Sequence, residues 1–574
     1  MKKLSFILAL IIALTGMIGL FATPAYAADI TPDYVVDGTT YANVGAALEA
    51  AAASEKETVY IRVDVDTAEA FNNAPIAKNI VVYSDNATAP TLTATAAAAD
   101  NVHPIDTSKY GGMFDMNGGS LTLENLNIVT DSDNYCAVYF NTTATGVGTL
   151  VINNCSIDTV GRSIHVNAGG TFTDNVNITV NNSSITSGKN ILQHNARTTG
   201  EATKAVINFN NVEFDASAGG VQVQNVYADI NFTNCTVKEG GSLKQLVYSS
   251  TKNTVHTLDV VGCDITTTEK TVGYANTANG TNFNFVDSVL KSPKYVVHVA
   301  HATTNVTTLG TFNFVNCDLE CTSTNYIIAL DPASKSGADI KGVVNIYSGT
   351  YKTAGKGLMA NDADARINIY GGSFISTSTT GFIMGGNTKA YFYGGTIDAT
   401  LPFAANNAGQ QATGIQAITD GTKTTYVPEG ITVDTTLLSA KGAQIVNGTT
   451  SESASTSIRL VFQIKATEAE LANYSAIGVW ASKSNSTVMD LGELNAQAKV
   501  TVLPTTTTVY TSVNADGVVV EAAEGYYYIL VEISNISNAN FADLIYVRPY
   551  VVAADGTTVT AGDAYVTSVN SFLK

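Results

Sequence analysis

The chain has 574 residues, of which only 14% are Asp, Glu, Lys or Arg, and its formal net charge at pH 7 is −19. So acidic a chain does not favour binding to nucleic acid or to an anionic membrane surface, because both need a basic patch. A hydrophobic content of 45% and only 11 prolines argue against disorder. Six cysteines in so long a chain do not make a disulfide framework. We therefore expect a folded, acidic protein of two or three domains.

The first segment has the features of a bacterial secretory signal peptide. Two lysines precede an apolar run from Leu4 to Ala22, and Ala25-Tyr26-Ala27 matches the small-x-small cleavage rule. We predict that residues 1–27 are a signal peptide and that cleavage occurs before Ala28. An uncleaved membrane anchor is the alternative, because the apolar run is close to spanning length. The expected mature protein has no membrane span and is secreted, extracellular or on the cell surface.

One pattern of eleven residues is repeated eleven times between residues 120 and 399. The copies start 23 to 32 residues apart, with a mean spacing near 27 residues. They are Ser120–Thr130, Thr149–Thr159, Asn177–Ser187, Val206–Ala216, Asp229–Glu239, Thr257–Thr267, Asn282–Ser292, Thr311–Cys321, Val343–Thr353, Arg366–Ser376 and Lys389–Ala399. A sustained period of this length is typical of a solenoid.

Within each copy, apolar and polar residues alternate as in a strand with one buried face. Positions 2 and 4 are apolar in nearly every copy, and positions 7 and 9 point inward again. Position 6 is often Asn, which tolerates left-handed backbone geometry and so suits a bend between two strands. A third short strand is expected between copies, at 138–141, 163–167, 220–225, 271–276, 295–300 and 326–331. Three strands per coil predict an all-β, right-handed parallel β-helix of about 11–13 coils.

The rung x-Φ-x-Φ-x-Asn-Cys-x-Φ, over residues 120–399, resembles that of the pectate-lyase-like β-helix superfamily. The stretch YANVGAALEAA from Tyr41 to Ala51 resembles the short helix that closes the amino end of such β-helices. Residues 58–64 and 79–83 look like early rungs, so we assign residues 28–400 to a β-helix with an N-terminal helical cap. The resemblance leaves the activity open, because this fold hosts lyases, hydrolases, epimerases, adhesins and phage spikes.

The resemblance also implies where any chemistry would lie, on the outer face of one long sheet. Pectate lyases hold Ca²⁺ with clustered carboxylates and use an Arg or Lys base, and the related glycosidases need two or three Asp from adjacent coils. The outward residues of the third strand are Tyr139, His165, Gln222, Gln224, Tyr248, Tyr274 and His298, and none is a carboxylate. The sequence therefore favours a non-enzymatic protein. A polysaccharide lyase or glycoside hydrolase is the alternative, with His165 and His298 as its catalytic candidates.

Metal and cysteine patterns are sparse. Asp131 with Asp133, and Asp362 with Asp364, resemble halves of a calcium loop, although loop acids are usually only solvated. No zinc-ligand spacing occurs, so we expect no cofactor, with calcium at those four residues as the alternative.

The cysteines at inward position 7 are predicted to be small buried core residues: Cys155, Cys235, Cys263 and Cys317. Strand spacing would not forbid a bridge between Cys235 and Cys263, which lie in neighbouring copies.

A row of tyrosines gives the predicted carbohydrate-binding surface. Tyr347, Tyr370 and Tyr393 occupy outward position 5 of three successive copies, and Tyr391 adds a fourth ring. Aromatic rings beside hydrogen-bonding groups suit sugars, because each ring offers an apolar face and a polar tip. The alternative is that these tyrosines form a like-residue ladder that only stabilises the β-helix.

The repeat fades after residue 399. We interpret residues 401–434 as a cap or linker and residues 435–574 as a β-sandwich accessory domain. Its expected strands are 458–464, 474–481, 500–503, 508–513, 526–533 and 545–553, with a hairpin turn at Asp555-Gly556 and Trp480 in the core. The opening KGAQI at Lys441, the RLVF strand at Arg459 and the RPY strand at Arg548 are similar to accessory domains of secreted proteins from clostridia-like bacteria.

Together these features predict a secreted β-helix scaffold that binds extracellular polysaccharide or a cell-surface partner. The first alternative is the enzyme described above. The second alternative is a self-assembling structural surface protein, because the surface is weakly charged, regular and rich in Asn and Thr.

Overall fold

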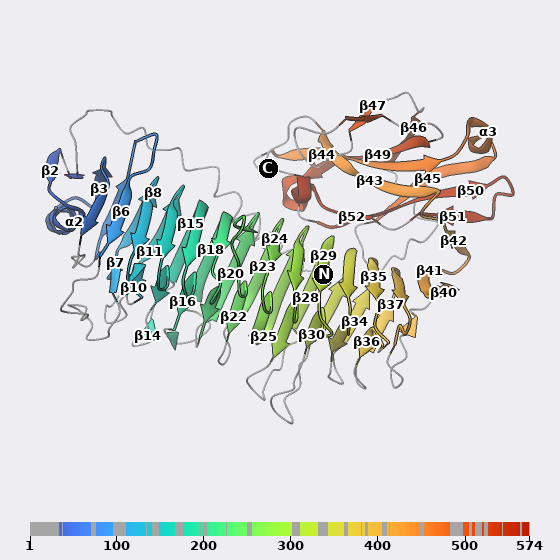
Figure 1. Ribbon diagram of the computed structural model, residues 1–574. Helices are drawn as coiled ribbons and strands as arrows, with labels where there is room; N and C mark the ends of the chain where they lie inside the picture. The colour runs from blue at the N-terminus through green and yellow to red at the C-terminus, as the bar shows by residue number, and fades with distance from the viewer. Residues whose placement is uncertain are drawn as a thin grey trace.

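The computed structural model shows a long parallel β-helix followed by a smaller β-domain (Figure 1). It describes residues 34–36, 38–69, 76–95, 111–133, 135–140, 148–166, 171–172, 176–195, 197–198, 204–224, 227–249, 255–300, 310–330, 342–360, 365–379, 381–384, 389–403, 410–411, 414–446, 453–482, 498–503, 508–510, 519–521, 526–541, 543–562 and 565–572. The predicted signal peptide, residues 1–27, lies outside these ranges. Within them, none of the helices has the length and apolar character needed to cross a bilayer.

The amino end of the β-helix is closed by a helix, as the sequence predicts. Helix α2 (Val44–Ala53) begins at Asn43, whose side chain accepts a hydrogen bond from the backbone N–H of Ala46 at 2.7 Å. The helix buries Leu48 and three other residues. Strand β1 (Tyr34–Val36) pairs antiparallel with β2 (Thr39–Tyr41) and with the first coil. Such a cap is needed because an open end would expose the core and unpaired backbone groups.

Each coil begins with a strand whose side chains alternate between the core and the outer face. These first strands are β3 (Thr58–Val63), β5 (Asn79–Tyr83), β8 (Ser120–Glu124), β11 (Thr149–Asn153), β15 (Val176–Ser187), β18 (Lys204–Asp215), β20 (Tyr227–Thr233), β23 (Val255–Val261), β25 (Val272–Val286), β28 (Gly310–Val315), β31 (Gly342–Ile346), β34 (Arg366–Ile369) and β37 (Lys389–Phe392). They pair in parallel from coil to coil in the register that the repeat predicts, for example Ile152 with Val180. The inward residues form the continuous core.

The second strand of each coil follows a sharp bend. The second strands are β4 (Thr67–Glu69), β6 (Thr91–Ala94), β9 (Asn127–Thr130), β12 (Ser156–Thr159), the carboxyl halves of β15 and β18, β21 (Thr236–Val237), β24 (Asp264–Thr266), β26 (Val289–Ser292), β29 (Cys317–Cys321), β32 (Gly349–Thr353), β35 (Ser373–Ser376) and β38 (Thr396–Ala399). The predicted bend residues all have a positive φ, between 49° and 54°. They are Asn125, Asn154, Asn182, Asn211, Asn234 and Asn316. The prediction from position 6 is therefore confirmed.

The third strands form a separate parallel sheet, which we call the third sheet. They are β7 (Gly111–Met116), β10 (Tyr135–Phe140), β13 (Ile164–Val166), β16 (Leu192–His194), β19 (Val221–Val223), β22 (Val247–Ser249), the amino end of β25, β27 (Val297–Ala300), β30 (Ile328–Leu330), β33 (Leu358–Ala360) and β36 (Ile383–Met384). All six predicted third strands are present. A two-stranded sheet of β14 (Thr171–Phe172) and β17 (Arg197–Thr198) lies apart from this sheet in the strand pairing.

The cysteines at position 7 are buried, as predicted, and they are not joined by disulfides in this structure. The structure adds a reason for a small polar side chain at this position. The residue after the bend has a backbone N–H that donates to the side chain of its counterpart in the next coil: Cys155 to Ser183 Oγ at 3.0 Å, and Cys263 to Ser288 Oγ at 3.1 Å. A buried N–H without a partner is costly, so Ser or Cys at position 7 satisfies both the volume and the hydrogen bond.

The strand pattern changes where the sequence predicts a cap or linker. Strand β39 (Gln410–Gln411) still pairs in parallel with β37, but β40 (Ile415–Asp420) and β41 (Lys423–Pro428) form an antiparallel hairpin against β38. This hairpin covers the edge of the last coil, which would otherwise expose unpaired backbone groups. Strand β42 (Ile431–Val433) then pairs with the carboxyl-terminal domain.

The carboxyl-terminal domain is a sandwich of two sheets around a common core. One sheet holds β42, β45 (Tyr474–Ser482), β50 (Ile545–Ala553), β51 (Val559–Ala561) and β52 (Tyr565–Thr567), and the other holds β43 (Leu438–Val446), β44 (Ser455–Lys465), β46 (Ala498–Leu503) and β49 (Tyr526–Ser537). The short elements α3 (Glu468–Leu471), β47 (Thr508–Tyr510) and β48 (Val519–Glu521) complete the described part, with single turns at Asn538–Asn540 and Val569–Phe572. The predicted turn at Asp555-Gly556 joins β50 to β51, with Gly556 at φ 72°. Trp480 is buried against Tyr550, as expected of a core residue.

The sandwich packs against the later coils of the β-helix (Figure 1). Tyr546 and Val566 of the sandwich meet Val315 and Tyr347 of the β-helix in one buried apolar cluster. Because Tyr347 belongs to the predicted carbohydrate-binding row, this contact bears directly on the choice of functional site.

Candidate functional site

The tyrosine row is stacked along the axis of the β-helix. Ring centroids are 5.1 Å apart between Tyr347 and Tyr370 and 4.8 Å apart between Tyr370 and Tyr393, with interplanar angles of 9° and 21°. The rings therefore turn their faces toward one another rather than toward solvent. A sugar-binding platform needs an open ring face. Stacking at one coil spacing covers the faces of these rings, so they lack the open aromatic surface that a sugar would pack against.

The sandwich covers part of the same row. Tyr347 is only 2% exposed and lies 5.9 Å from Tyr546, centroid to centroid, and Tyr370 packs on the same cluster. The row at position 5 is polar in the early coils and apolar in the later ones: Asn153, Asn181, Asn210, Thr233, Val261, Val286, Val315, Tyr347, Tyr370 and Tyr393. This change from Asn to Val and Tyr along the row is the sequence signal that could have predicted an apolar strip on which the sandwich docks. A binding role for the half-buried Tyr391 and Tyr393 stays a prediction.

The outer face of the third sheet carries one residue that the sequence analysis missed. Asp115 of β7 is in register with Tyr139, which is in register with His165. The expectation that this row holds no carboxylate is therefore wrong at its first coil. The segment GGMFDM precedes the copy at Ser120 just as residues 135–140 precede the next copy, and this equivalence could have revealed β7.

His165 is packed among polar and aromatic neighbours. Its ring lies 5.5 Å from the ring of Tyr139, and Asp115 Oδ1 accepts a hydrogen bond from the backbone N–H of Gly112 at 3.1 Å. Burial, with the nearby charge of Arg162, lowers the pKa of His165 to about 3. Burial likewise lowers the pKa of the core residue His194 to about 3, with a further contribution from His165. A histidine with so low a pKa is a weak base, so His165 is poorly suited to proton abstraction at neutral pH.

A different group lies beside His298, and its four residues occupy equivalent positions in consecutive coils. Lys270, Tyr295, Tyr326 and Lys356 each come two residues before a paired core residue of the third strand. The two phenol rings stack with centroids 6.2 Å apart. The ammonium of Lys270 lies 5.0 Å from the Tyr295 centroid, and that of Lys356 lies 5.3 Å from the Tyr326 centroid. We call these four residues the cation–tyrosine row.

His298 packs beside the cation–tyrosine row. Its ring stacks on Tyr295 with centroids 4.5 Å apart, and Lys270 Nζ lies 3.0 Å from its Nδ1. Burial, together with the charge of Lys270, lowers the pKa of His298 to about 4. The neutral imidazole thus accepts a hydrogen bond from the lysine. His298 is better suited to hold Lys270 in place than to act as a base.

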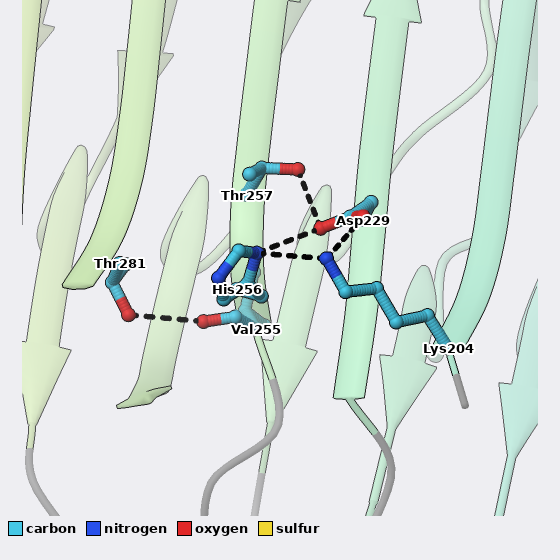
Figure 2. Close-up of polar contacts among 6 residues, drawn as sticks. All are labelled: Lys204, Asp229, Val255, His256, Thr257 and Thr281. Carbon is cyan, nitrogen blue, oxygen red and sulfur yellow. Dashed lines mark hydrogen bonds and ion pairs between the residues drawn. The ribbon is translucent and has the colours of Figure 1, made fainter. Parts of the chain in front are cut away.

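A third polar group, absent from the sequence predictions, lies on the outer face of the first strands (Figure 2). Asp229 Oδ2 is 3.1 Å from Lys204 Nζ, and Asp229 Oδ1 is 3.2 Å from His256 Nδ1. Thr257 donates to Asp229 Oδ1 at 2.8 Å. Lys204, Asp229 and His256 come from β18, β20 and β23, so three consecutive coils converge on one carboxylate.

His256 reaches Asp229 because of a local irregularity in the sheet. Ala228 pairs with Val255 and Asp229 with Thr257, so His256 is the extra residue of a β-bulge. Burial alone would raise the pKa of Asp229, but the hydrogen bond from His256 and the charge of Lys204 outweigh it and hold that pKa below its ordinary value. Asp229 is therefore a carboxylate that orients His256 and leaves its Nε2 for other chemistry. No repeat pattern could reveal this group, because the bulge breaks the register.

Position 3 of the first strands forms a hydrogen-bonded amide ladder. Each side-chain nitrogen donates to the oxygen of the preceding coil: Asn208 to Thr179, Asn231 to Asn208, Asn284 to Asp259, Asn313 to Asn284, Asn345 to Asn313 and Asn368 to Asn345, at 2.7 to 3.2 Å. Asp259 is the one carboxyl group in this series, paired in register with Asn231. Burial, with the nearby charge of Asp229, raises the pKa of Asp259 to about 7, although the hydrogen bond from Asn284 opposes the rise. Protonated Asp259 can donate to Asn231 and continue the ladder.

Of the four calcium candidates, the structure describes Asp131 and Asp133. Asp133 forms an ion pair with Lys189, which competes with a metal for the same carboxylate. Asp362 and Asp364 lie outside the described residues. Across the described ranges, no cluster of three or more His, Cys, Asp or Glu side chains is arranged to hold a metal ion.

Comparisons with known proteins add no assignment to this geometry. No family model matches the chain, and neither a curated protein nor a solved structure matches it. The parallel β-helix fold is clear from the strand pairing itself. Any function must therefore be argued from the three groups described above.

Proposed function

We propose that this protein is a secreted or surface-exposed β-helix scaffold that binds polysaccharide along the amino ends of the third strands. The observation that carries the proposal is the cation–tyrosine row. Its phenol and ammonium groups belong to four consecutive coils, and all four side chains are partly exposed. The predicted signal peptide supports the extracellular location.

The chemistry of the row suits a linear, hydroxyl-rich polymer. The phenol groups of the partly exposed tyrosines can donate to and accept from sugar hydroxyls, while the lysines supply charged donors. Equivalent groups repeat at the coil spacing of about 4.8 Å, so a chain lying along the β-helix axis meets several of them. Many modest contacts in a row give useful affinity without a deep cavity.

The proposal is tested with a glycan array probed with residues 28–574 and with a Tyr295→Ala, Tyr326→Ala double variant. We expect binding to at least one polysaccharide, and at least a tenfold loss of affinity in the double variant. The matched control is Tyr60→Ala, because Tyr60 is an exposed tyrosine on an early coil. Equal binding by the double variant and the control would refute this site. Absence of binding to any glycan, with ordered fibres in the purified protein, would instead support the self-assembling structural protein.

One observation favours a second candidate function, an enzyme that acts on a polysaccharide. His256 is held by Asp229 next to Lys204, an arrangement in which the carboxylate fixes the ring and its outer nitrogen can take a proton. The assay follows new reducing ends and unsaturated products for every glycan that binds. Product that disappears in His256→Gln but persists in His165→Gln would establish this candidate. Binding without product in the wild-type chain would leave the scaffold as the function.

A further inference from the structure

Two of the six cysteines face each other in neighbouring coils. Thr236 pairs in register with Asp264, so the preceding residues, Cys235 and Cys263, occupy the same inward position one coil apart. Both side chains are buried, and the backbone N–H of Cys235 donates to Cys263 Sγ at 3.4 Å.

No other cysteine has a cysteine at the equivalent position of an adjacent coil. In register, Cys155 lies between Leu126 and Ser183, and Cys317 lies between Ser288 and Gly349. Cys136 is flanked by Gly112 and an arginine, and Cys321 by a serine and a threonine. The contact between Cys235 and Cys263 is therefore specific to two coils in the middle of the solenoid.

We infer that Cys235 and Cys263 form a disulfide that cross-links these two coils when the chain folds under oxidising conditions. Neighbouring strands are about 4.8 Å apart, which falls within the Cα separation of about 4.4–6.8 Å that a disulfide bridges. The two residues are 28 positions apart in the chain. In a solenoid each coil contacts only its neighbours, so a bond between two coils resists their separation at that point.

The oxidant is a small-molecule disulfide such as oxidised glutathione. Either cysteine can attack first while the coils assemble. When the Cys263 thiolate attacks one sulfur of that disulfide, one glutathione thiolate is released and a mixed disulfide is left on Cys263. Cys235 loses its proton to the released thiolate and attacks the Cys263 sulfur, which expels the second glutathione. The two cysteines lose two electrons and two protons in total, and one disulfide is reduced to two thiols.

Burial also determines when the bond can form. With both sulfurs inside the core, an oxidant reaches them while the coils assemble rather than after folding. The predicted secretory route would take the unfolded chain to a compartment that permits disulfides. This inference is independent of the proposed polysaccharide binding, because the two cysteines face the core and the cation–tyrosine row faces outward.

The test is refolding of residues 28–574 with either glutathione redox buffer or a reducing agent, followed by thiol titration in denaturant and peptide mapping. We expect two fewer titratable thiols than the six of the reduced chain, and a single cross-linked peptide joining Cys235 to Cys263. Cys235→Ser and Cys263→Ser should each abolish the cross-link. Serine is accommodated here, because Ser183 and Ser288 occupy the same position in other coils. Cys155→Ser and Cys317→Ser are the matched controls and should keep the cross-link.

The outcomes separate cleanly. Six free thiols after oxidative refolding to a native circular dichroism spectrum would overturn the inference, as would a cross-link that maps to any other pair. The bond should also raise the thermal midpoint of the oxidised protein, and reduction should return it to the value of Cys235→Ser. Equal midpoints for oxidised and reduced protein would overturn the stabilising role of the cross-link.

Discussion

Tyr347 of the β-helix and Tyr546 of the sandwich lie with their ring centroids 5.9 Å apart, and both are almost completely buried. Their contact joins the two domains through an apolar strip whose β-helix side is the later half of the position 5 row. Burial raises the pKa of Tyr546, and the neighbouring Tyr347 adds to the rise, as expected of a phenol held away from water. The aromatic row thus serves domain docking at Tyr347 and Tyr370.

Removing the ring of Tyr546 should release the sandwich from the β-helix. Tyr546→Ala creates a cavity at the interface, and we expect a cost of about 3 kcal/mol, within the usual range for a buried aromatic side chain. Small-angle scattering should show a larger radius of gyration, and the domains should unfold in two separate transitions. Tyr60→Ala, which changes an exposed tyrosine far from the interface, should leave the radius of gyration unchanged. An unchanged radius in Tyr546→Ala would contradict this account of the interface.

Replacing Asp259 by Asn should stabilise the protein at neutral and higher pH. Asn284 already donates to Asp259 Oδ1 at 2.7 Å, and an amide at this position can also donate to Asn231 without needing a proton. Asp259→Asn should therefore raise the denaturation midpoint at pH 8 and change it little at pH 4. A midpoint at pH 8 below that of the wild type would show that the ladder does not continue through this position.

The pH dependence of that effect follows from the raised pKa of Asp259. Its pKa is about 7 in the folded chain and near 3.8 when unfolded, so the folded state holds a proton that the unfolded state has lost. The contribution is fully present below pH 4 and is lost as the pH rises to 7, an amount of up to about 4 kcal/mol. The wild-type chain should show this loss in urea titrations across that range, whereas Asp259→Asn should not.

The buried histidines should act in the opposite direction. The pKa values of His165 and His194 are lowered to about 3, and that of His298 to about 4. Their contribution to the free energy of unfolding is present above pH 6.5 and is lost as the pH falls toward these values. The reason is that the unfolded chain then binds protons that the folded chain does not bind. Each histidine should add about 1.4 kcal/mol per pH unit to the acid slope of the unfolding free energy. His165→Gln should reduce that slope, measured between pH 4.5 and 6; an unchanged slope would argue against a buried neutral ring.

The left-handed bend residues should distinguish Ala from Gly. Asn154 has φ 52° and an exposed side chain, so substitution there changes mainly the backbone preference. Asn154→Ala should cost about 1–2 kcal/mol, because Ala lacks the short polar side chain that lets Asn tolerate the left-handed conformation, whereas Asn154→Gly should cost less than about 1 kcal/mol. The chain itself uses Gly262, with φ 64°, at the same position of another copy. Equal destabilisation by both substitutions in urea unfolding would contradict this reading of the bend.

Much of the fold was predictable because it depends on local patterns repeated many times. The alternation within each copy fixed which side chains face the core, and Asn at position 6 marked the bends that the structure shows at Asn154 and its counterparts. The N-terminal cap, the hairpin at Asp555-Gly556 and most strands of the sandwich were recognisable from their own local patterns, whereas β43 and β52 were not among the expected strands. The candidate site was predicted less well. Asp115 was missed because its coil has no complete copy before it, and His256 because a bulge shifts it out of the repeat.

The amino-acid sequence by itself determined the solenoid, its register and the identity of the outward rows, since each follows from side-chain periodicity along one strand. Only the tertiary structure decided what those rows do. Stacking at the coil spacing turned the faces of Tyr347 and Tyr370 toward each other, and the sandwich then covered them. The convergence of Lys204, Asp229 and His256, and the contact of Cys235 with Cys263, likewise arise between coils. The physical reason is that periodicity sets the direction in which a side chain points, whereas its neighbours and its access to solvent depend on segments far away in the chain.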